Sequence, residues 1–394
     1  MNKYDRITPE GTRDSLFAEC TLRRELENRL HGLFTARGYS EIITPTLEFF
    51  DVFSRKAQPF PQEQMYKLTD AKGRLMVLRP DNTVPIARVC ATRLKDVALP
   101  LRLCYNQNIH VISPSLKGRD DEITQAGIEL IGSDSRMADL EVIAAAADAL
   151  AACSDTYTLE LGNAGLLRTL TARLPADTVE QLRDCIETKN YPALNDLLDS
   201  LPESGETAVL RMLPRLYGGE EVFSKASALC PDPAFTAILD DLHSLWRSVA
   251  QFAGKDRVTV DLGMMHRTDY YTGMIIRGYL SGAGEEILSG GRYDKLIAEF
   301  GYDVPATGFA VNIDAAVKVL GKQQAVSPDA ISVSNVLIWA AKGCEAEAVR
   351  AAQSLREKGL IVEHSLSETL EEARSYASAH GIDSVLPIEQ TKEG

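Results

Sequence analysis

The stretch LRLCYNQNIHVISPSLKGRDDEITQAGIELI, residues 101–131, indicates a long antiparallel hairpin. Its two strand-like segments, 101–111 and 122–131, flank the polar loop 113–120. Apolar and β-branched residues on both sides of a polar turn are typical of adjacent antiparallel strands. The hairpin therefore predicts a sheet with antiparallel pairing.

The segment before this hairpin predicts a helix that leads into a strand. Apolar side chains recur at helical spacing over residues 20–37, at Leu22, Leu26, Leu30, Leu33 and Phe34. Gly38 suits the position that follows a helix, where glycine tolerates a left-handed backbone. Residues 41–44 then predict a strand, which Pro45 ends.

The remaining segments up to residue 320 predict strands and helices that are segregated along the chain. A second hairpin is expected over 64–78 with its turn at Lys72-Gly73, followed by a helix over 85–94. A further helix is expected over 136–152. Further strands are expected at 156–161, 257–262, 274–280, 287–289 and 307–313. This pattern predicts an α+β domain over residues 1–320.

Two other parts of the chain have a different pattern. Residues 165–255 predict helices interrupted by prolines, and we interpret them as a helical insertion. Residues 321–335 are largely polar and predict a linker. Strands at 336–340, 360–364 and 384–388 alternate with helices at 343–358 and 366–380. Residues 336–394 therefore predict a small α/β domain.

Composition is that of an ordinary globular protein. The 394 residues include 42 Lys and Arg against 56 Asp and Glu, a formal net charge of −14, and 45% are hydrophobic. This excludes a disordered chain, a collagen-like fibre and a disulfide scaffold. The acidic balance argues against broad binding of nucleic acid, because neutralising phosphates requires a concentrated basic surface.

The cysteines and histidines predict neither disulfides nor a metal site. The seven cysteines are dispersed, without a C-x-x-C pair, as expected for reduced thiols in a cytoplasmic protein. No histidine has metal-ligand spacing, so we expect no metal and no cofactor. The longest apolar stretch, 142–153, is too short to span a membrane, and the first residues do not resemble a secretory signal.

Four segments in order carry a resemblance to a known family. They are RPDNT at 79–83, similar to R-P-E-G-T; residues 117–132, similar to K-G-R…Q-x-G-x-E-x-x-G; DYYTG at 269–273; and GGRYD at 290–294 with GFA at 308–310. Together they resemble the histidyl-tRNA synthetase family over about residues 8–316. The resemblance implies a class II synthetase fold, an antiparallel sheet with flanking helices. It also implies at least a homodimer, formed through the helix and the strand before Pro45.

The resemblance further implies a pocket for L-histidine. Asp81, Thr83 and Gln125 would take the α-ammonium, Glu129 and Tyr270 would bind the imidazole, and Tyr271 and Tyr293 would complete the wall. Asp81 is one methylene shorter than the family's glutamate. The arginine that binds the ligand carboxylate in the family is absent, and the sequence does not indicate which residue would replace it. Without the family pattern, residues 79–83 would be interpreted as a polar turn, and Tyr270 and Tyr271 as aromatic residues of the core.

By the same resemblance the ATP site has lost its arginines. Aligned on Pro114, the arginine and glutamate positions of the second motif hold His110 and Ile112. The arginine of the third motif is replaced by Ala315, and a further catalytic arginine by His266. Because removing one donor to a charged transition state typically costs about 10²–10³ in rate, we expect no catalytic residues and no amino-acid activation. A catalytic or metal-binding histidine pair is the weaker alternative.

This combination resembles the branch of the family that forms the regulatory subunit of ATP phosphoribosyltransferase. It implies a non-catalytic partner of the short-form catalytic subunit, required for activity in the first step of histidine biosynthesis and involved in feedback inhibition by histidine. Two alternatives stay open, an active histidyl-tRNA synthetase and a structural scaffold with a vestigial pocket. The C-terminal domain resembles a truncated anticodon-binding domain, so tRNA is not expected as a partner.

Overall fold

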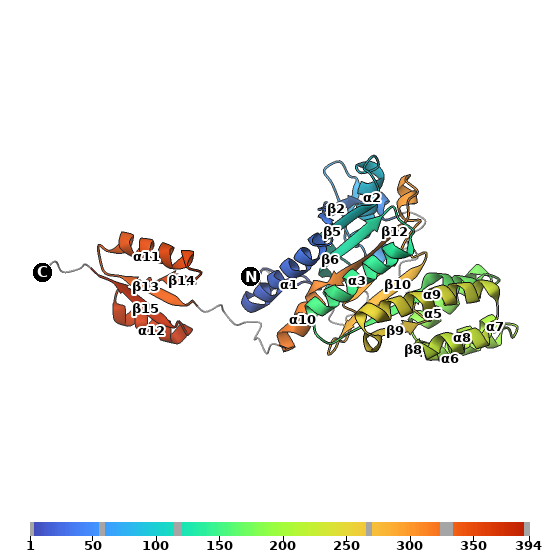
Figure 1. Cartoon of the computed structure of the whole chain (residues 1–394). Helices are drawn as coiled ribbons and strands as arrows, with labels where there is room; N and C mark the ends of the chain where they lie inside the picture. Colours follow the sequence, from blue (N-terminus) through green and yellow to red (C-terminus); the bar gives the residue numbers. More distant parts are fainter. Residues whose placement is uncertain (1–3, 55–59, 114–119, 265–269, 324–333, 390–394) are drawn as a thin grey trace. The chain divides into compact units, whose positions relative to one another are not determined.

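The computed structural model describes residues 4–54, 60–113, 120–264, 270–323 and 334–389 (Figure 1). The chain divides into two compact units. The first consists of Met1–Ser15 and Glu19–Ala325, and the second of Leu16–Ala18 and Val326–Gly394. Among the described residues, no helix combines the length and the apolar character needed to cross a lipid bilayer.

A nine-stranded sheet forms the centre of the first unit. In spatial order its strands are β1 (Ser40–Glu41), β5 (Leu101–His110), β6 (Glu122–Ile131), β12 (Ala306–Asn312), β11 (Leu288–Arg292), β10 (Met274–Leu280), β7 (Tyr157–Asn163), β9 (Val258–Asp261) and β8 (Tyr217–Gly218). Neighbouring strands are antiparallel except at β1–β5 and β7–β9. The predicted hairpin is confirmed, because β5 and β6 pair from Leu101–Ile131 to His110–Glu122.

Helices cover one face of this sheet. They are α1 (Phe17–Thr35), α3 (Arg136–Cys153) and α10 (Ile313–Gln323), with α3 lying along the strands in Figure 1. The predicted apolar stripe of α1 is buried at Leu22, Leu26, Leu30 and Phe34, whereas Leu33 is half-buried. The ring of Phe34 packs edge-on against Phe309 of β12 at 5.9 Å between centroids. We call this side of the sheet the helix face.

A smaller antiparallel sheet holds the second predicted hairpin. It consists of β2 (Leu47–Phe49), β4 (Leu75–Leu78) and β3 (Lys67–Thr69) in that spatial order, with short 3-10 helices at Phe50–Val52 and Gln62–Gln64. Gly73 has a φ of +74° in the turn, as expected. The strand expected over 41–44 is shorter, since β1 ends at Glu41. The N–H of Thr44 instead donates to Gln107 Oε1 at 2.8 Å.

The helical range after β7 folds as expected, with one difference. Its helices are α4 (Ala164–Thr171), α5 (Ala176–Glu187), α6 (Tyr191–Asp199), α7 (Gly205–Met212), α8 (Glu221–Leu229) and α9 (Pro233–Ala253). A short 3-10 turn lies at Leu213–Arg215 and another directly after α9 at Lys255–Arg257, and a third lies outside this range, between β11 and β12, at Ile297–Phe300. The difference is β8, a two-residue strand that pairs with β9 and joins this range to the large sheet.

The second unit is a three-layer α/β structure. Its parallel strands β13 (Val336–Ala340), β14 (Val362–His364) and β15 (Ser384–Ile388) lie in the order β14-β13-β15. One face packs on α11 (Glu345–Glu357) and the other on α12 (Leu370–His380). Helix α10 of the first unit continues to Gln323, into the range expected as a linker. Residues 324–333 of that range lie outside the described residues.

Both edges of this parallel sheet have features that hinder pairing with a further strand. At the β14 edge, Arg356 Nη2 donates to the outward carbonyl of Val362 at 2.7 Å. At the β15 edge, the N–H of Ala341 reaches the carbonyl of Ile388, so that Val385 and Pro387 direct their backbone groups outward. Proline has no N–H to offer there.

Candidate functional site

A buried carboxylate lies on the face of the large sheet opposite the helix face. Glu129 of β6 is only 1% exposed. The hydroxyl of Thr83 donates to Glu129 Oε1 at 2.8 Å, and the hydroxyl of Tyr293 donates to Oε2. Because residues of a strand alternate between faces, Gln125 and Gly127 share this side, which we call the pocket face.

Glycines make the room that these side chains occupy. A Cβ on Gly308 of β12 would overlap the Glu129 carboxylate, and one on Gly127 would lie 2.5 Å from the hydroxyl of Tyr105. A Cβ on Gly291 of β11 would lie 2.8 Å from the ring of Tyr271. The glycines of the family-like motifs therefore form a floor low enough for a carboxylate and aromatic rings.

Three tyrosines line the pocket face above this floor. The ring centroid of Tyr270 lies 4.8 Å from that of Tyr271 and 5.8 Å from that of Tyr293. All three side chains are buried, at 7%, 8% and 2% exposed. Burial raises the pKa of Tyr271 and of Tyr293, so both remain protonated donors at neutral pH.

Burial also sets the charge of the two carboxylates. Removal from water raises the pKa of Glu129 to about 8, a rise that the donors Tyr293 and Thr83 reduce and the charge of Asp81 increases. The same cause raises the pKa of Asp81 to about 6. Asp81 is half-buried, and its Oδ1 accepts the N–H of Val84 at 2.8 Å, where α2 (Thr83–Thr92) begins.

The Arg79–Thr83 segment is anchored by a buried polar network. Arg79 donates to Gln107 Oε1 at 2.6 Å and to the carbonyls of Asn108 and Thr44 at 2.6 and 2.8 Å. Asn82 is fully buried, and its Nδ2 donates to the carbonyl of Gln107 at 3.3 Å and to Gln125 Oε1 at 3.1 Å. Arg79 therefore positions this segment through the ends of β5.

One residue of the pocket was not expected from the sequence. Tyr105 of β5 pairs with Gly127 and shares the pocket face; it is 3% exposed and hydrogen-bonded to the Thr83 side chain. The register of the hairpin explains this position. Leu103 pairs with Glu129, so Tyr105, two residues further along β5, lies on the same face as Glu129. The sequence alone does not give that register, because the length of the connecting loop is uncertain.

The residues expected to form the pocket thus lie together. Hydrogen bonds join Thr83 and Tyr293 to Glu129. The ring of Tyr270 contacts the rings of Tyr271 and Tyr293. Gln125 is hydrogen-bonded to Asn82, which follows Asp81 in the chain, and the Asp81 carboxylate accepts the N–H of Val84.

The positions assigned to a lost ATP site are not gathered there. His110, the residue aligned with the family's arginine, lies on the helix face, on the other side of the sheet from the pocket. Its Nε2 is 3.6 Å from Glu122 Oε1. Ile112 is half-buried, and Ala315 is buried in the first turn of α10. His266 lies outside the described residues.

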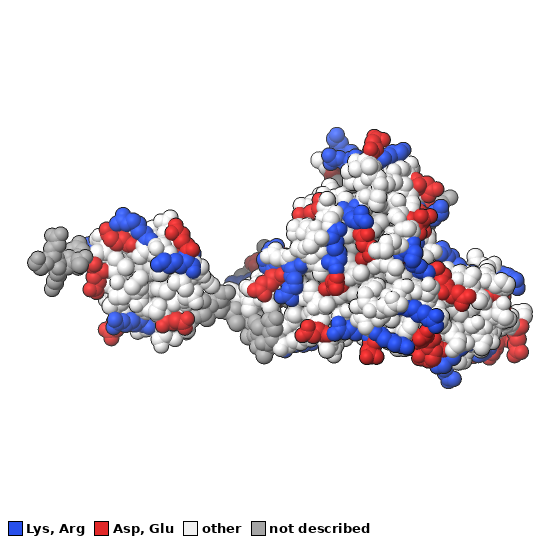
Figure 2. All heavy atoms as spheres, viewed as in Figure 1, with Lys and Arg blue, Asp and Glu red and all other residues white. Residues whose placement is uncertain are grey.

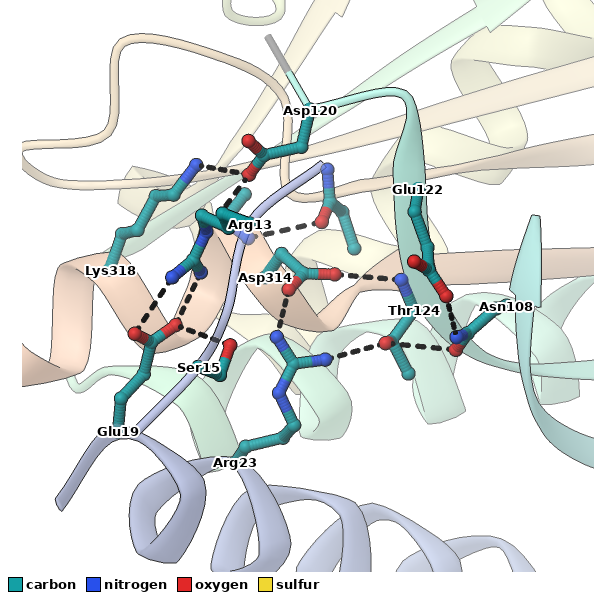
Figure 3. Close-up of polar contacts among 12 residues, drawn as sticks. Arg13, Ser15, Glu19, Arg23, Asn108, Asp120, Glu122, Thr124, Asp314 and Lys318 are labelled. Carbon is teal, nitrogen blue, oxygen red and sulfur yellow. Dashed lines mark hydrogen bonds and ion pairs between the residues drawn. The ribbon is translucent and has the colours of Figure 1, made fainter. Parts of the chain in front are cut away.

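The helix face carries a separate polar network (Figure 3). Asp314 of α10 pairs with Arg23 of α1 and accepts the N–H of Thr124 at 2.7 Å. Arg23 also donates to the Thr124 hydroxyl at 2.6 Å. Nearby, Asp120 accepts from Arg13 and Lys318. The network therefore ties α1, α10 and the base of the hairpin together.

Two surface features bear on other ligands. Among the described residues, no group of three or more His, Cys, Asp or Glu side chains is arranged to hold a metal ion. Figure 2 shows Lys and Arg side chains interspersed with Asp and Glu over the displayed face of the first unit. The expectation that tRNA is not a partner stays a prediction.

Comparison with known proteins places the chain in a family. The model of the family described as histidyl-tRNA synthetase matches residues 11–316. An ATP phosphoribosyltransferase regulatory subunit from Clostridium kluyveri is 42% identical, covering 96% of this chain and 97% of that protein. One from Clostridium acetobutylicum is 40% identical, covering 100% and 97%.

Solved structures agree with this placement. A protein described as an ATP phosphoribosyltransferase regulatory subunit/histidyl-tRNA synthetase from Bacillus halodurans C superposes with a TM-score of 0.86 at 28% identity, covering 99% of this chain and 100% of that one. Histidyl-tRNA synthetase from Nostoc gives a TM-score of 0.77 at 20% identity, covering 96% and 90%, and shares the fold. The predicted class II synthetase-like α+β fold is confirmed.

Proposed function

The chain belongs to the histidyl-tRNA synthetase family and, within it, to the ATP phosphoribosyltransferase regulatory subunits, and we propose that it binds L-histidine in the pocket around Glu129. In this role it would activate the short-form catalytic subunit and make that subunit sensitive to histidine. The supporting observation is the buried Glu129 carboxylate, which has hydroxyl donors on both oxygens and a raised pKa.

An imidazole suits this carboxylate. Glu129 is desolvated, and the hydroxyls of Thr83 and Tyr293 leave lone pairs that a ligand N–H can reach. Imidazole offers such an N–H and has an ordinary pKa of about 6.5, so it shares a proton readily with a carboxyl of pKa about 8. An analogue without the N–H would leave the buried acceptor unsatisfied, which a site of this kind rejects strongly.

The α-ammonium of histidine would lie beside Asp81 and Thr83. Asp81 is half-buried at the start of α2, where its carboxylate can offset a ligand cation. A nearby ammonium would lower the raised pKa of Asp81 and favour its charged form. Together with the Thr83 hydroxyl, Asp81 provides the acceptors that a zwitterionic ligand requires.

The proposed role is non-catalytic. Ile112 and Ala315, at positions where the family resemblance places ATP-binding residues, have no charge to offer a triphosphate, and His110 lies on the helix face. Transfer of an adenylyl group depends on fixed cations around the phosphates. Histidine binding would then be a signal instead of the first step of aminoacylation.

Self-association to a homodimer is part of the proposal. Two large apolar side chains on the same side of β2 are exposed, Leu47 (43%) and Phe49 (43%), and Ile43 (78%) is exposed in the segment just before β2. Clustered exposed apolar residues commonly mark a protein interface. This segment follows the α1 helix, in the part of the chain where the resemblance implies dimer formation.

Reconstitution tests the proposal. The chain is titrated into the short-form ATP phosphoribosyltransferase from the same source, and product formation is followed with and without histidine. We expect activity that saturates at a fixed ratio and falls when histidine is added. The variant Glu129→Gln should still activate but should lose histidine sensitivity, whereas Glu122→Gln on the helix face should behave like the unchanged chain.

Other outcomes identify the alternatives. Histidine-dependent exchange between ATP and pyrophosphate by the chain alone would establish an active synthetase. Failure to activate at any ratio, combined with failure to bind histidine, would leave a structural scaffold with a vestigial pocket.

A further inference from the structure

Asn82 is a buried amide at a position where the similar family motif has glycine. The family's R-P-E-G-T reads Arg79-Pro80-Asp81-Asn82-Thr83 in this chain. The Asn82 side chain is 0% exposed and reaches between β5 and β6. Its Nδ2 donates to the backbone carbonyl of Gln107 on β5 and to Gln125 Oε1 on β6.

The backbone carbonyl determines which way both amides are turned. A carbonyl oxygen only accepts, so the Asn82 atom that faces Gln107 O must be the NH2 group. Rotating Asn82 by half a turn would set two oxygens against each other inside the protein. The same NH2 group faces Gln125, so the Gln125 atom turned toward Asn82 must be its oxygen.

The Gln125 NH2 group is consequently free to serve a ligand. Gln125 is half-buried on the pocket face, four residues from Glu129 along β6. At a rise of about 3.4 Å per residue the two residues lie about 14 Å apart along the strand. An amino acid with an imidazole side chain can bridge this span with hydrogen bonds at both ends. In the described part of the chain, the Gln125 NH2 group has no hydrogen-bond partner.

We propose that Asn82 is a positioning residue that turns the Gln125 amide so that its N–H donors hold the α-carboxylate of the ligand. This inference rests on the proposed binding of histidine and assigns the carboxylate end that the missing arginine leaves open. The inference also changes the expected role of Gln125. Its side-chain oxygen accepts a hydrogen bond from Asn82 and therefore does not bind the ammonium of the ligand. The ammonium is left to Asp81 and Thr83.

Comparison of histidine with histamine, which lacks the carboxylate, tests this assignment. Calorimetric titration of the full-length chain should give a preference for L-histidine of about tenfold or more. Gln125→Glu keeps the acceptor for Asn82 but presents a carboxylate to the ligand. It should abolish or reverse the preference, because two carboxylates repel each other.

Asn82→Gly and Tyr293→Phe complete the experiment. Asn82→Gly frees the Gln125 amide to rotate, and it should reduce the preference for histidine at least severalfold while histamine binding stays nearly unchanged. Tyr293→Phe removes a donor at the imidazole end and should weaken both ligands by the same factor. It is therefore the matched control for a loss that does not depend on the carboxylate.

The outcomes separate this inference from the proposed function. Equal losses of histidine and histamine in Gln125→Glu and Asn82→Gly, with the preference retained, would overturn the positioning role. Absence of histidine binding in the unchanged chain would instead contradict the proposed function and the ligand on which the inference depends. If Asn82→Gly does not fold, the partly exposed Gln125→Glu decides the result by itself.

Discussion

The charged form of Glu129 destabilises the free protein, because its carboxylate is buried and, among the described residues, only hydroxyl groups donate hydrogen bonds to it. Burial raises its pKa from the ordinary 4.5 to about 8. Between these values the folded chain keeps a proton that the unfolded chain has lost, so rising pH favours unfolding. The cost is absent below pH 4.5 and grows by about 1.4 kcal/mol per pH unit until pH 8.

Glu129→Gln should therefore stabilise the free chain in alkaline solution while it removes histidine binding. We expect the free energy of unfolding to rise by up to about 5 kcal/mol at pH 8 and by less than about 1 kcal/mol at pH 5. Urea unfolding at both pH values measures the difference. An equal effect at the two pH values would show that Glu129 does not titrate as its burial indicates.

At the residue scale, sequence reasoning found the charged members of the pocket and missed its connections. Glu129 and Tyr293 stand in motifs with a family resemblance, so they could be named without coordinates. Tyr105 and Asn82 act through the pairing of β5 with β6, which depends on a register that no local pattern encodes. The position of His110 on the helix face could not be predicted for the same reason.

Among the elements, β12 shapes the pocket through the absence of a side chain. Gly308→Ala would place a methyl group against the Glu129 carboxylate. We expect a loss of about 1–3 kcal/mol in stability and at least about tenfold weaker histidine binding. Gly32→Ala in α1 is the control, because a Cβ there meets nothing within 4 Å and should slightly stabilise the helix. If Gly308→Ala binds histidine as well as the unchanged chain, Gly308 is not required to make room for the Glu129 carboxylate.

The network on the helix face joins α1 to α10 and β6. Arg23→Ala leaves the Asp314 carboxylate without its cation, although the N–H of Thr124 remains. Because Asp314 is only 9% exposed at its side chain, we expect a loss of about 2–3 kcal/mol in urea unfolding. Arg29→Ala on the same helix, whose exposed side chain reaches the Ala152 carbonyl, should cost less than about 0.5 kcal/mol. Equal costs would remove any special role for Asp314.

At the element scale, the sequence predicted most helices and strands because their periodicity is strong. The α1 stripe and the β5–β6 hairpin were both expected within a few residues. β8 was not expected, since a two-residue strand has no periodicity and exists only through its pairing with β9. The strand after α1 was overestimated because side-chain hydrogen bonds to Thr44 replace its ladder.

At the scale of the whole molecule, the apolar surface near β2 predicts the oligomeric state. Leu47 and Phe49 project from the same side of β2, and both are 43% exposed. The double variant Leu47→Glu/Phe49→Glu should convert a homodimer to a monomer in light scattering coupled to size exclusion. Leu366→Glu, at a residue 98% exposed in the second unit, should leave the mass unchanged. If the double variant remains a dimer, the dimer interface does not include Leu47 and Phe49.

The hindered edges of the sheet in the second unit have a consequence for behaviour in concentrated solution. Open strand edges recruit further strands and lead to aggregation. Here Pro387 offers an approaching strand a carbonyl but no N–H, and the Val362 carbonyl is already engaged by Arg356. Each edge of this three-stranded sheet therefore offers an incoming strand fewer backbone partners than an unprotected edge would, which disfavours pairing between copies of the second unit.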